Sequence, residues 1–421
     1  MQRQVLIINE GQLIQVTDFW SRLQKPSPVS YTALKIPNSS PDDGFQIISD
    51  PVYKASSPHG WLFRNGTQVT TIGNNAYVSI GESLFQVKIP GQPVVPVFKP
   101  LLSPKGLFDS NWEKSASPTT ESNQRASCIQ IFYLVNVLHD IFYQYGFTEA
   151  AGNFQVDNFN KGGLGNDALK VNNQNDMYRN DAQFATPPDG QQPVMDMFLF
   201  DAVSPERDGS LDSMIPIHEF THGVTKRLTG GSRNAMCLQG NEPNGLSEGW
   251  SDAMAVFLTR SVNSHRNDSV LFANYVVGGT NATKGIRPMA YSTDFSVFPD
   301  VYSNITNYAD QAYPIGAIWA NALYEMYWNL VDNSGFHENW YDSKSLEGNI
   351  VAFKLVVGGL IFQPCNPTFL QARDAIIQAD KTYYDGKFNC LIWKAFAKRG
   401  MGTDAAQKGY SNGFGVPPNC K

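Results

Sequence analysis

Two histidines four positions apart enclose a glutamate in the segment His218-Glu219-Phe220-Thr221-His222. Side chains four residues apart on a helix lie one turn apart on the same face. If the segment is helical, His218 and His222 can bind one Zn²⁺, and Glu219 lies beside the ion as a candidate general base. The alternative is a surface helix with two solvated histidines. With only 6 His in 421 residues, the spacing favours the metal interpretation.

A pair of acids further along the chain can complete this site. A catalytic zinc needs three protein ligands and one open position. Glu248 and Asp252 are four residues apart in a predicted helix that has Ser247 near its start. Glu248 can supply the third ligand, and Asp252 can accept a hydrogen bond from the free ring nitrogen of a ligating histidine. The alternative is that both are first-turn acids that interact with the helix dipole.

Helical periodicity dominates the C-terminal part of the chain. The helix with the two histidines is expected to begin near Ser213, because Pro216 is tolerated in a first turn, where the N–H groups have no helical partner. Apolar spacings of three and four predict further helices at 315–332, 349–362, 370–384 and 390–399. The aromatic residues of the first of these are interpreted as core.

The N-terminal part of the sequence has a different pattern. Short alternating runs at 68–72 and 76–80 predict strands, and another strand is expected near 195–200. Residues 126–145 predict a long apolar helix, in which His139 is interpreted as a core or helix-surface residue because no ligand spacing surrounds it. The length exceeds one ordinary core, so we expect two domains of a mixed α+β protein.

Composition and charge exclude several classes of partner. The net charge is −6 and no dense run of Lys and Arg occurs, so no nucleic-acid partner is expected. The longest apolar stretch, 355–362, is too short to cross a bilayer, so no membrane partner is expected either. We expect a monomer.

Cysteines and glycosylation motifs bear on the compartment. Cys128 lies in an apolar helical run and is expected to be a buried thiol. Cys365, Cys390 and Cys420 could include one disulfide, but the sequence leaves the pairing open. Five N-x-S/T motifs, at Asn38, Asn65, Asn267, Asn281 and Asn304, favour a secreted glycoprotein.

Several separate stretches of the sequence, in order, resemble one known family. These are Gly146–Phe154, Phe184–Gly190, His218–Gly231, Gln363–Pro367, Gln371–Ile377 and Phe396–Gly400. They resemble the fungalysins, secreted fungal zinc metallopeptidases related to the thermolysin-like enzymes. The resemblance covers roughly residues 28 to 420. It implies a two-domain thermolysin-like fold, with a β-rich α+β catalytic domain at 28–230, a mainly helical domain at 231–421 and the zinc site in the cleft between them.

The resemblance also gives an expectation for the N-terminus. Residues 11–21 resemble the last strand of the fungalysin propeptide, and residues 1–10 lack the apolar core of a signal peptide. We therefore expect 1–27 to be the remnant of a propeptide that inhibits a zymogen, with the mature enzyme beginning near Val29. The alternative is that residues 1–27 form an edge strand of the catalytic domain.

The resemblance assigns further residues to substrate and catalysis. The family has an Asn-Ala pair on an edge strand that holds peptide substrates, and the corresponding residues here are Asp181 and Ala182. Arg287 resembles an arginine that hydrogen-bonds a substrate carbonyl; a structural ion pair is the alternative. Tyr313 occupies the place of a histidine that stabilises the oxyanion. In fungalysins a cysteine precedes the active helix, whereas this chain has Gly209.

The function expected from these residues is secreted, zinc-dependent cleavage of internal peptide bonds in proteins or peptides. Glu219 would take the proton of the attacking water, and the ion would lower the pKa of water to about 7 and polarise the carbonyl. A zinc aminopeptidase is one alternative, although no acidic anchor for a substrate amine is evident. A weakened or inactive zinc-binding relative that binds peptides is the other, suggested by Tyr313 and Asp181.

Overall fold

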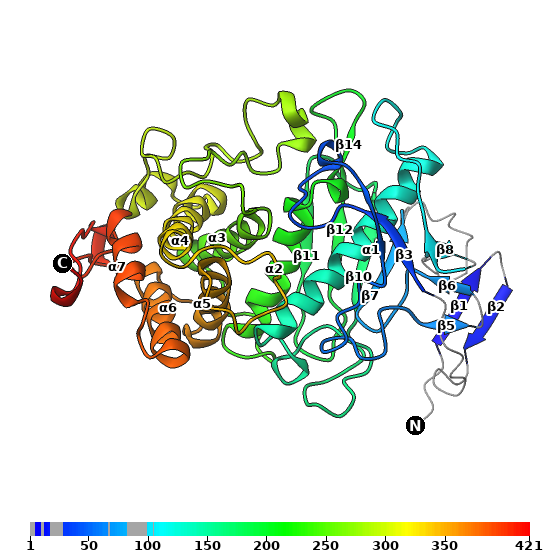
Figure 1. Cartoon of the computed structure of the whole chain (residues 1–421), viewed down its shortest axis with the longest axis horizontal. Helices are drawn as coiled ribbons and strands as arrows, with labels where there is room; N and C mark the ends of the chain where they lie inside the picture. The colour runs from blue at the N-terminus through cyan, green and yellow to red at the C-terminus, as the bar shows by residue number, and fades with distance from the viewer. Residues whose placement is uncertain (1–4, 10–11, 17–27, 66–67, 82–98, 104) are drawn as a thin grey trace.

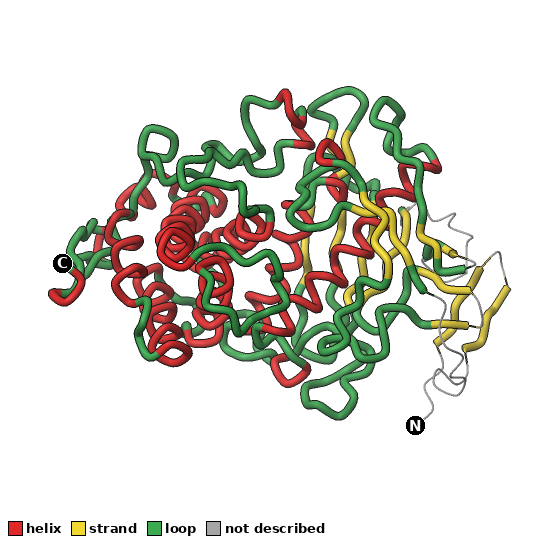
Figure 2. Tube along the Cα trace, viewed as in Figure 1, coloured by secondary structure: helices red, strands yellow, loops and turns green. Residues whose placement is uncertain are grey.

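Strands and helices occupy different parts of this chain. The computed structural model describes residues 5–9, 12–16, 28–65, 68–81, 99–103 and 105–421. Strands gather on the N-terminal side of the molecule, and the C-terminal side is built from helices (Figure 2). The protein is therefore of the mixed α+β class, as the sequence predicts.

A four-stranded mixed sheet lies next to the helix with the two histidines. Its order is β11 (Ala182–Ala185), β12 (Val194–Met197), β10 (Leu169–Asn173) and β7 (Ala76–Ile80). β10 is parallel to both of its neighbours, and β11 is antiparallel to β12. Within the described residues β11 is an edge strand, and an edge strand presents unpaired main-chain groups.

The remaining strands form small sheets. They are β1 (Val5–Asn9) with β2 (Gln12–Val16), β4 (Gln46–Ser49) with β3 (Ser30–Ala33) and β9 (Leu107–Phe108), β5 (Arg64–Asn65) with β6 (Gln68–Thr70) and β8 (Leu102–Ser103), and β13 (Leu199–Phe200) with β14 (Arg207–Asp208). In the described part of the N-terminal segment, β1 pairs only with β2. The rest of that segment lies outside the described residues, and its propeptide origin stays a prediction.

Helix α1 (Glu121–Gln144) forms the centre of the N-terminal core. It is long and apolar enough to pass for a membrane span, but 94% of its most apolar window is buried inside the protein, which is typical of a core helix. His139 is buried within it and lies 3.0 Å from Asp140 through Nδ1 and Oδ1. It lies in the core, one of the two positions that the sequence predicts.

The C-terminal helices follow the predicted ranges closely. They are α2 (Met214–Leu228), α3 (Asn241–Leu258), α4 (Ala312–Ser334), α5 (Gly348–Phe362), α6 (Phe369–Tyr384) and α7 (Asn389–Lys398). Short 3-10 helices occupy Pro41–Asp43, Glu149–Ala151, Gly209–Leu211, Tyr275–Val277, Gly279–Asn281, Tyr302–Tyr308, Lys408–Tyr410 and Pro418–Cys420. Figure 1 shows α2 between the sheet and the other helices, and it contacts both β11 and α3.

One predicted boundary was wrong. Helix α3 begins at Asn241, not near Ser247, so Glu248 and Asp252 lie well inside the helix. The N-cap residue is Gly240, which has no side chain to mark the start. The proposal that the two acids are first-turn residues at the helix dipole therefore does not apply.

Two disulfides connect the helical part. Cys390 pairs with Cys420, within the predicted set, whereas Cys237 pairs with Cys365, which the sequence did not indicate. The second bridge joins the loop after α2 to the loop after α5 and closes 128 residues of chain. Cys128 is a buried free thiol as expected, and burial raises its pKa to about 12.

Candidate active site

Helix α2 brings the two histidines against the sheet. Fourteen of its 15 residues, all except Lys226, are buried, so both the sheet and the helices cover it. At Gly223 an added Cβ would lie 2.6 Å from the Phe154 ring and 2.8 Å from the Phe184 ring of β11. Because Gly223 has no side chain, α2 can lie close to the edge strand β11 at His222, the residue before Gly223.

A second glycine positions the glutamate of α3. A Cβ added to Gly316 of α4 would lie 2.6 Å from Glu248 Cβ and 2.7 Å from the Gly245 carbonyl oxygen. Helices α3 and α4 therefore meet at a separation that only small residues permit. This contact fixes the stretch of α3 from which Glu248 reaches α2.

The three candidate ligands converge. One ligand atom from each of His218, His222 and Glu248 lies within 4.8 Å of the others. Nε2 of His218 is 3.3 Å from Glu248 Oε2, and Nε2 of His222 is 3.5 Å from Glu248 Oε1. Glu248 Oε2 is buried and makes no hydrogen bond. Two imidazole nitrogens and a carboxylate around one point match the donor set of a mononuclear zinc centre.

Hydrogen bonds orient both imidazole rings. His218 Nδ1 lies 2.7 Å from Asp252 Oδ1. His222 Nδ1 lies 3.1 Å from Ser247 Oγ and 3.3 Å from Ser251 Oγ. Because these contacts engage Nδ1, each ring presents Nε2 to the point shared with Glu248.

Asp252 is the centre of a buried network. Arg287 donates Nε to Oδ2 at 2.7 Å and Nη2 to Oδ1 at 2.9 Å, and Tyr291 donates its hydroxyl to Oδ2. Burial alone would raise the pKa of Asp252, but the charge of Arg287 and the hydrogen bond from His218 hold it well below its usual range. Asp252 therefore stays ionised and fixes His218.

The titration of the ligands follows from these contacts. Burial lowers the pKa of His222 to about 3, so its ring is neutral, the form that binds a metal. Burial would also lower the pKa of His218, but the hydrogen bond to Asp252 and the charges of Asp252 and Glu248 outweigh it and raise the pKa to about 10. Burial would raise the pKa of Glu248, but the charges of His222 and His218 outweigh this effect and lower the pKa to about 2.

Glu219 lies beside the ligands and is 6% exposed. Burial raises its pKa to about 7, and the charges of Glu248 and Asp181 act in the same direction. No described residue of the chain hydrogen-bonds its carboxylate. A buried carboxylate with a pKa near 7 and free oxygens is suited to accept a proton from a bound molecule.

The residues assigned through the family resemblance lie around the same point. Asp181 directly precedes β11; it is exposed, its Oδ1 accepts the N–H of Ala182 at 2.9 Å, and its charge is close enough to affect Glu219. Tyr313 is 49% exposed, and its ring lies 4.5 Å from the guanidinium carbon of Arg287. Desolvation of its hydroxyl raises the pKa of Tyr313 to about 12, so it remains a neutral donor.

Sequence reasoning missed three members of the site. Tyr291 supports Asp252, and Ser247 and Ser251 face His222. Ser247 lies one residue before Glu248, and Ser251 lies one residue before Asp252. The two serines are therefore also four residues apart, and this spacing could have predicted that they share one face of α3. Nothing in the sequence around Tyr291 indicates that it reaches α3.

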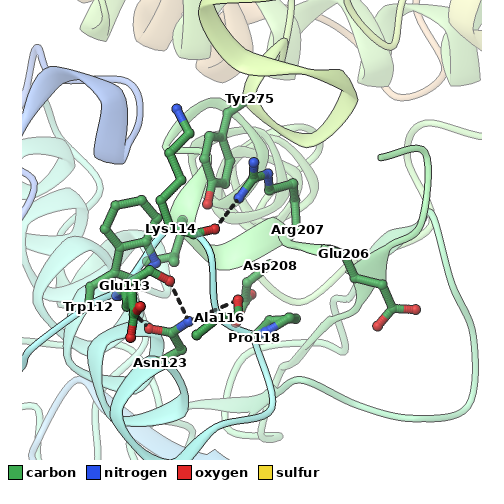
Figure 3. Close-up of a pocket in the computed structure, with 11 residues that line it drawn as sticks. Trp112, Glu113, Lys114, Ala116, Pro118, Asn123, Glu206, Arg207, Asp208 and Tyr275 are labelled. Atoms are coloured by element: carbon green, nitrogen blue, oxygen red, sulfur yellow. Dashed lines mark hydrogen bonds between the residues drawn. The ribbon is translucent and has the colours of Figure 1, made fainter. Parts of the chain in front are cut away.

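A second pocket lies away from the candidate metal centre. Figure 3 shows Arg207 donating to the Lys114 carbonyl beside Tyr275, with Asn123 bonded to Glu113. Its cavity of about 10 Å³ has room for about one water molecule. In the described part of the chain, only the His218, His222 and Glu248 group gathers three metal-binding side chains.

The fold and the site together define a mixed α+β protein in which two histidines and a glutamate converge on a candidate metal site. The family model described as Fungalysin metallopeptidase (M36) matches residues 30–405. This chain belongs to the fungalysin metallopeptidase family, as the sequence resemblance predicted.

Curated relatives agree with this assignment. The chain is 43% identical over 366 residues to "Extracellular metalloproteinase MEP" of Pyricularia oryzae, covering 85% of this chain and 55% of the relative. It is 41% identical over 367 residues to "Extracellular metalloproteinase mep" of Aspergillus flavus, with the same coverage. It is 38% identical over 404 residues to "Probable extracellular metalloproteinase 5" of Arthroderma benhamiae, covering 94% of this chain. The chain spans 55% to 62% of the length of these relatives.

Proposed function

We propose that this chain is the catalytic part of a secreted zinc endopeptidase that hydrolyses internal bonds of proteins or peptides. The convergence of His218, His222 and Glu248 on one point carries the proposal. Family membership supports a metal-dependent peptidase, and the names of the relatives, extracellular metalloproteinases, support secretion. The propeptide remnant at 1–27, the division into domains at 28–230 and 231–421, the cleft between them and the monomeric state are proposals of the same kind.

Zinc is the proposed ion. Two imidazoles and one carboxylate, with no fourth protein ligand in the described group, are typical of a catalytic zinc centre. When bound, the ion would polarise the scissile carbonyl and make water more acidic. Asp252 keeps His218 in position through its Nδ1.

Glu219 is the proposed general base. Water adds to the carbonyl carbon while the Glu219 carboxylate accepts its proton, and Glu219 then transfers this proton to the nitrogen as the C–N bond breaks. The free carboxylate oxygens and the pKa of about 7 suit both steps, because the group can both accept and return a proton near neutral pH.

Tyr313 and Arg287 are the proposed donors to the developing negative charge. Tyr313 can offer one neutral O–H in the place where the family has a histidine. Arg287 commits Nε and Nη2 to Asp252, which leaves Nη1 for a substrate carbonyl. Losing a well-placed oxyanion donor costs about 10²–10³ in rate, so a weak donor at this position would make a slow enzyme.

The free edge of β11 is the proposed substrate platform. A peptide that adds as a strand pairs through its main chain, so it can be held with varied side chains. Asp181 and Ala182 lie at the end of β11 beside Glu219. A peptide bound there would have its main chain in the same region as the candidate base and the candidate ligands.

Cleavage mapping on casein with wild type, Glu219→Gln and Tyr313→His tests the proposal. We expect one zinc per chain, chelator-sensitive cleavage at internal bonds, a loss of at least 100-fold in Glu219→Gln and a faster Tyr313→His. Cleavage only at free N-termini would support the aminopeptidase instead. Zinc binding and peptide binding without turnover in any of the three proteins would support the inactive relative, an alternative suggested by the exposed position of Tyr313.

A further inference from the structure

A cavity of about 580 Å³ adjoins the candidate active site. Thr186, which follows the last residue of β11, forms one wall, and Lys226, one helical turn beyond His222, forms another. Asn244, one turn before Glu248, and Ala312, next to Tyr313, complete it. Helices α2, α3 and α4, which carry His222, Glu248 and Tyr313, and the residue directly after β11 each supply a wall of this cavity, so the cavity extends the site.

The edge strand leads from the proposed reaction centre to the cavity. Strand residues rise about 3.3 Å each, so the five steps from Asp181 to Thr186 cover roughly 17 Å. A peptide paired with the free edge of β11 near Asp181 would therefore reach the cavity about four or five residues later. Thr186 is the next residue after the end of β11, so the cavity begins where the strand ends.

The chemistry of the walls fits polypeptide better than a compact apolar ligand. Thr186, Asn241 and Asn244 present hydroxyl and amide groups, Met236 contributes an exposed apolar side chain, and Lys226 makes no ion pair with any described residue. The volume lies in the range of about 300–1,000 Å³ found for ligand sites, but those sites are mostly apolar. Mixed donors and acceptors suit a main chain with varied side chains.

We propose that this cavity is a distal subsite that binds the polypeptide substrate four or five residues from the scissile bond. The inference rests on the proposed function and adds a substrate class to it: extended chains, not dipeptides or short peptides. It follows that occupancy of the cavity contributes binding only when the substrate is long enough on one side of the bond.

Binding of uncleaved peptides tests the subsite without relying on turnover. Fluorescent peptides with one cleavable bond are lengthened from two to six residues, on the N-terminal side in one series and on the C-terminal side in the other, and titrated against zinc-loaded Glu219→Gln. We expect the affinity to rise at least tenfold at the fourth or fifth residue of one series and then to level. A smooth or absent dependence on length in both series overturns the proposal.

Variants that fill the cavity locate the effect. Asn244→Trp, or Gln239→Trp if the first does not fold, should reduce the ratio of long-peptide to short-peptide affinity to near one. The matched control is Asn333→Trp on the exposed surface of α4, which should keep the ratio. An unchanged ratio in a folded cavity variant contradicts the subsite.

Turnover of the same peptides by wild type separates the two proposals. Cleavage that is equally fast for short and long peptides rejects the distal subsite and leaves the peptidase intact. Length-dependent binding with no cleavage by the wild type supports the subsite but rejects the endopeptidase. If no peptide of either series binds, both proposals fail.

Discussion

Replacing Arg287 with methionine should destabilise this protein more than it impairs substrate binding. The side chains of Arg287 and Asp252 are 8% and 1% exposed, and two hydrogen bonds of 2.7 and 2.9 Å join them. Removing one member of a buried ion pair leaves an uncompensated charge and costs about 3–5 kcal/mol. Tyr291 and His218 still contact Asp252, so we expect the lower end, about 3 kcal/mol.

The effect should depend on pH in a defined direction. Arg287 helps to hold the pKa of Asp252 below its unfolded value of 3.8. A depressed carboxyl pKa contributes stability that is present above the unfolded pKa and is lost as the pH falls through the folded one. The difference between wild type and Arg287→Met should therefore be full at pH 6–7 and shrink below about pH 4.

Urea unfolding followed by tryptophan fluorescence, with chelator present so that metal binding does not contribute, measures this difference. Arg179→Met is the matched control, because its ion pair with Glu206 is 3.4 Å long and exposed, and such pairs contribute about 0–1 kcal/mol. If Arg287→Met unfolds within about 1 kcal/mol of the wild type while KM rises strongly, the ion-pair reasoning is refuted and substrate binding is the main role of Arg287.

Three other predictions concern the ligands and the base. Gly316→Ala should push Glu248 away from the histidines and weaken zinc binding at least tenfold, measured by competition with a chromogenic chelator, with little loss of helix content by circular dichroism. Asp181→Asn removes a negative charge that raises the pKa of Glu219, so the acid limb of kcat/KM should move to lower pH by about half a unit; an upward shift would contradict this sign. Because His218 has a pKa of about 10 and must lose its proton to bind an ion, zinc binding at pH 8 should release about one proton, and calorimetry in two buffers should show it.

The local part of the site could be predicted from the sequence. The period of a helix alone places His218 and His222 on one face, and it likewise pairs Glu248 with Asp252. Both pairs are found on helices, α2 and α3, and the helices after them match the apolar spacing. Such features depend on neighbours in the chain, so a single sequence carries them.

The start of α3 shows why the sequence misled. Ser247 has the residue type of an N-cap, yet its hydroxyl faces His222 Nδ1 at 3.1 Å inside the helix. The helix begins at Asn241, and its N-cap residue Gly240 offers no side-chain cap and no recognisable signal. Capping types indicate a helix start only when no tertiary contact uses the same hydroxyl.

Contacts between distant segments could not be predicted. The distance between α3 and α4 depends on Gly316 facing Glu248, a fact about two helix surfaces and not about either sequence segment. The disulfide of Cys237 with Cys365 depends likewise on which loops the packed helices bring together. Arg287 could be singled out only through the family resemblance, which predicted a contact with a substrate carbonyl. The alternative, a structural ion pair, named no partner, so the bonds to Asp252 were not predicted.

Tyr313 is connected to the candidate ligand His218 through a chain of three contacts, so its replacement should affect more than one property. Its ring stacks on the guanidinium of Arg287, which in turn bonds Asp252, the partner of His218. A histidine at this position would donate to the oxyanion more strongly but could lose the stacking on Arg287, and cation–π contacts contribute about 0.5–2 kcal/mol. A double-mutant cycle of Tyr313→His and Arg287→Lys, read by urea unfolding and by kcat/KM, separates these effects. We expect a coupling of at least about 0.5 kcal/mol in unfolding. If the changes in unfolding free energy are additive, the two side chains act independently in stability, and Tyr313 affects only the reaction.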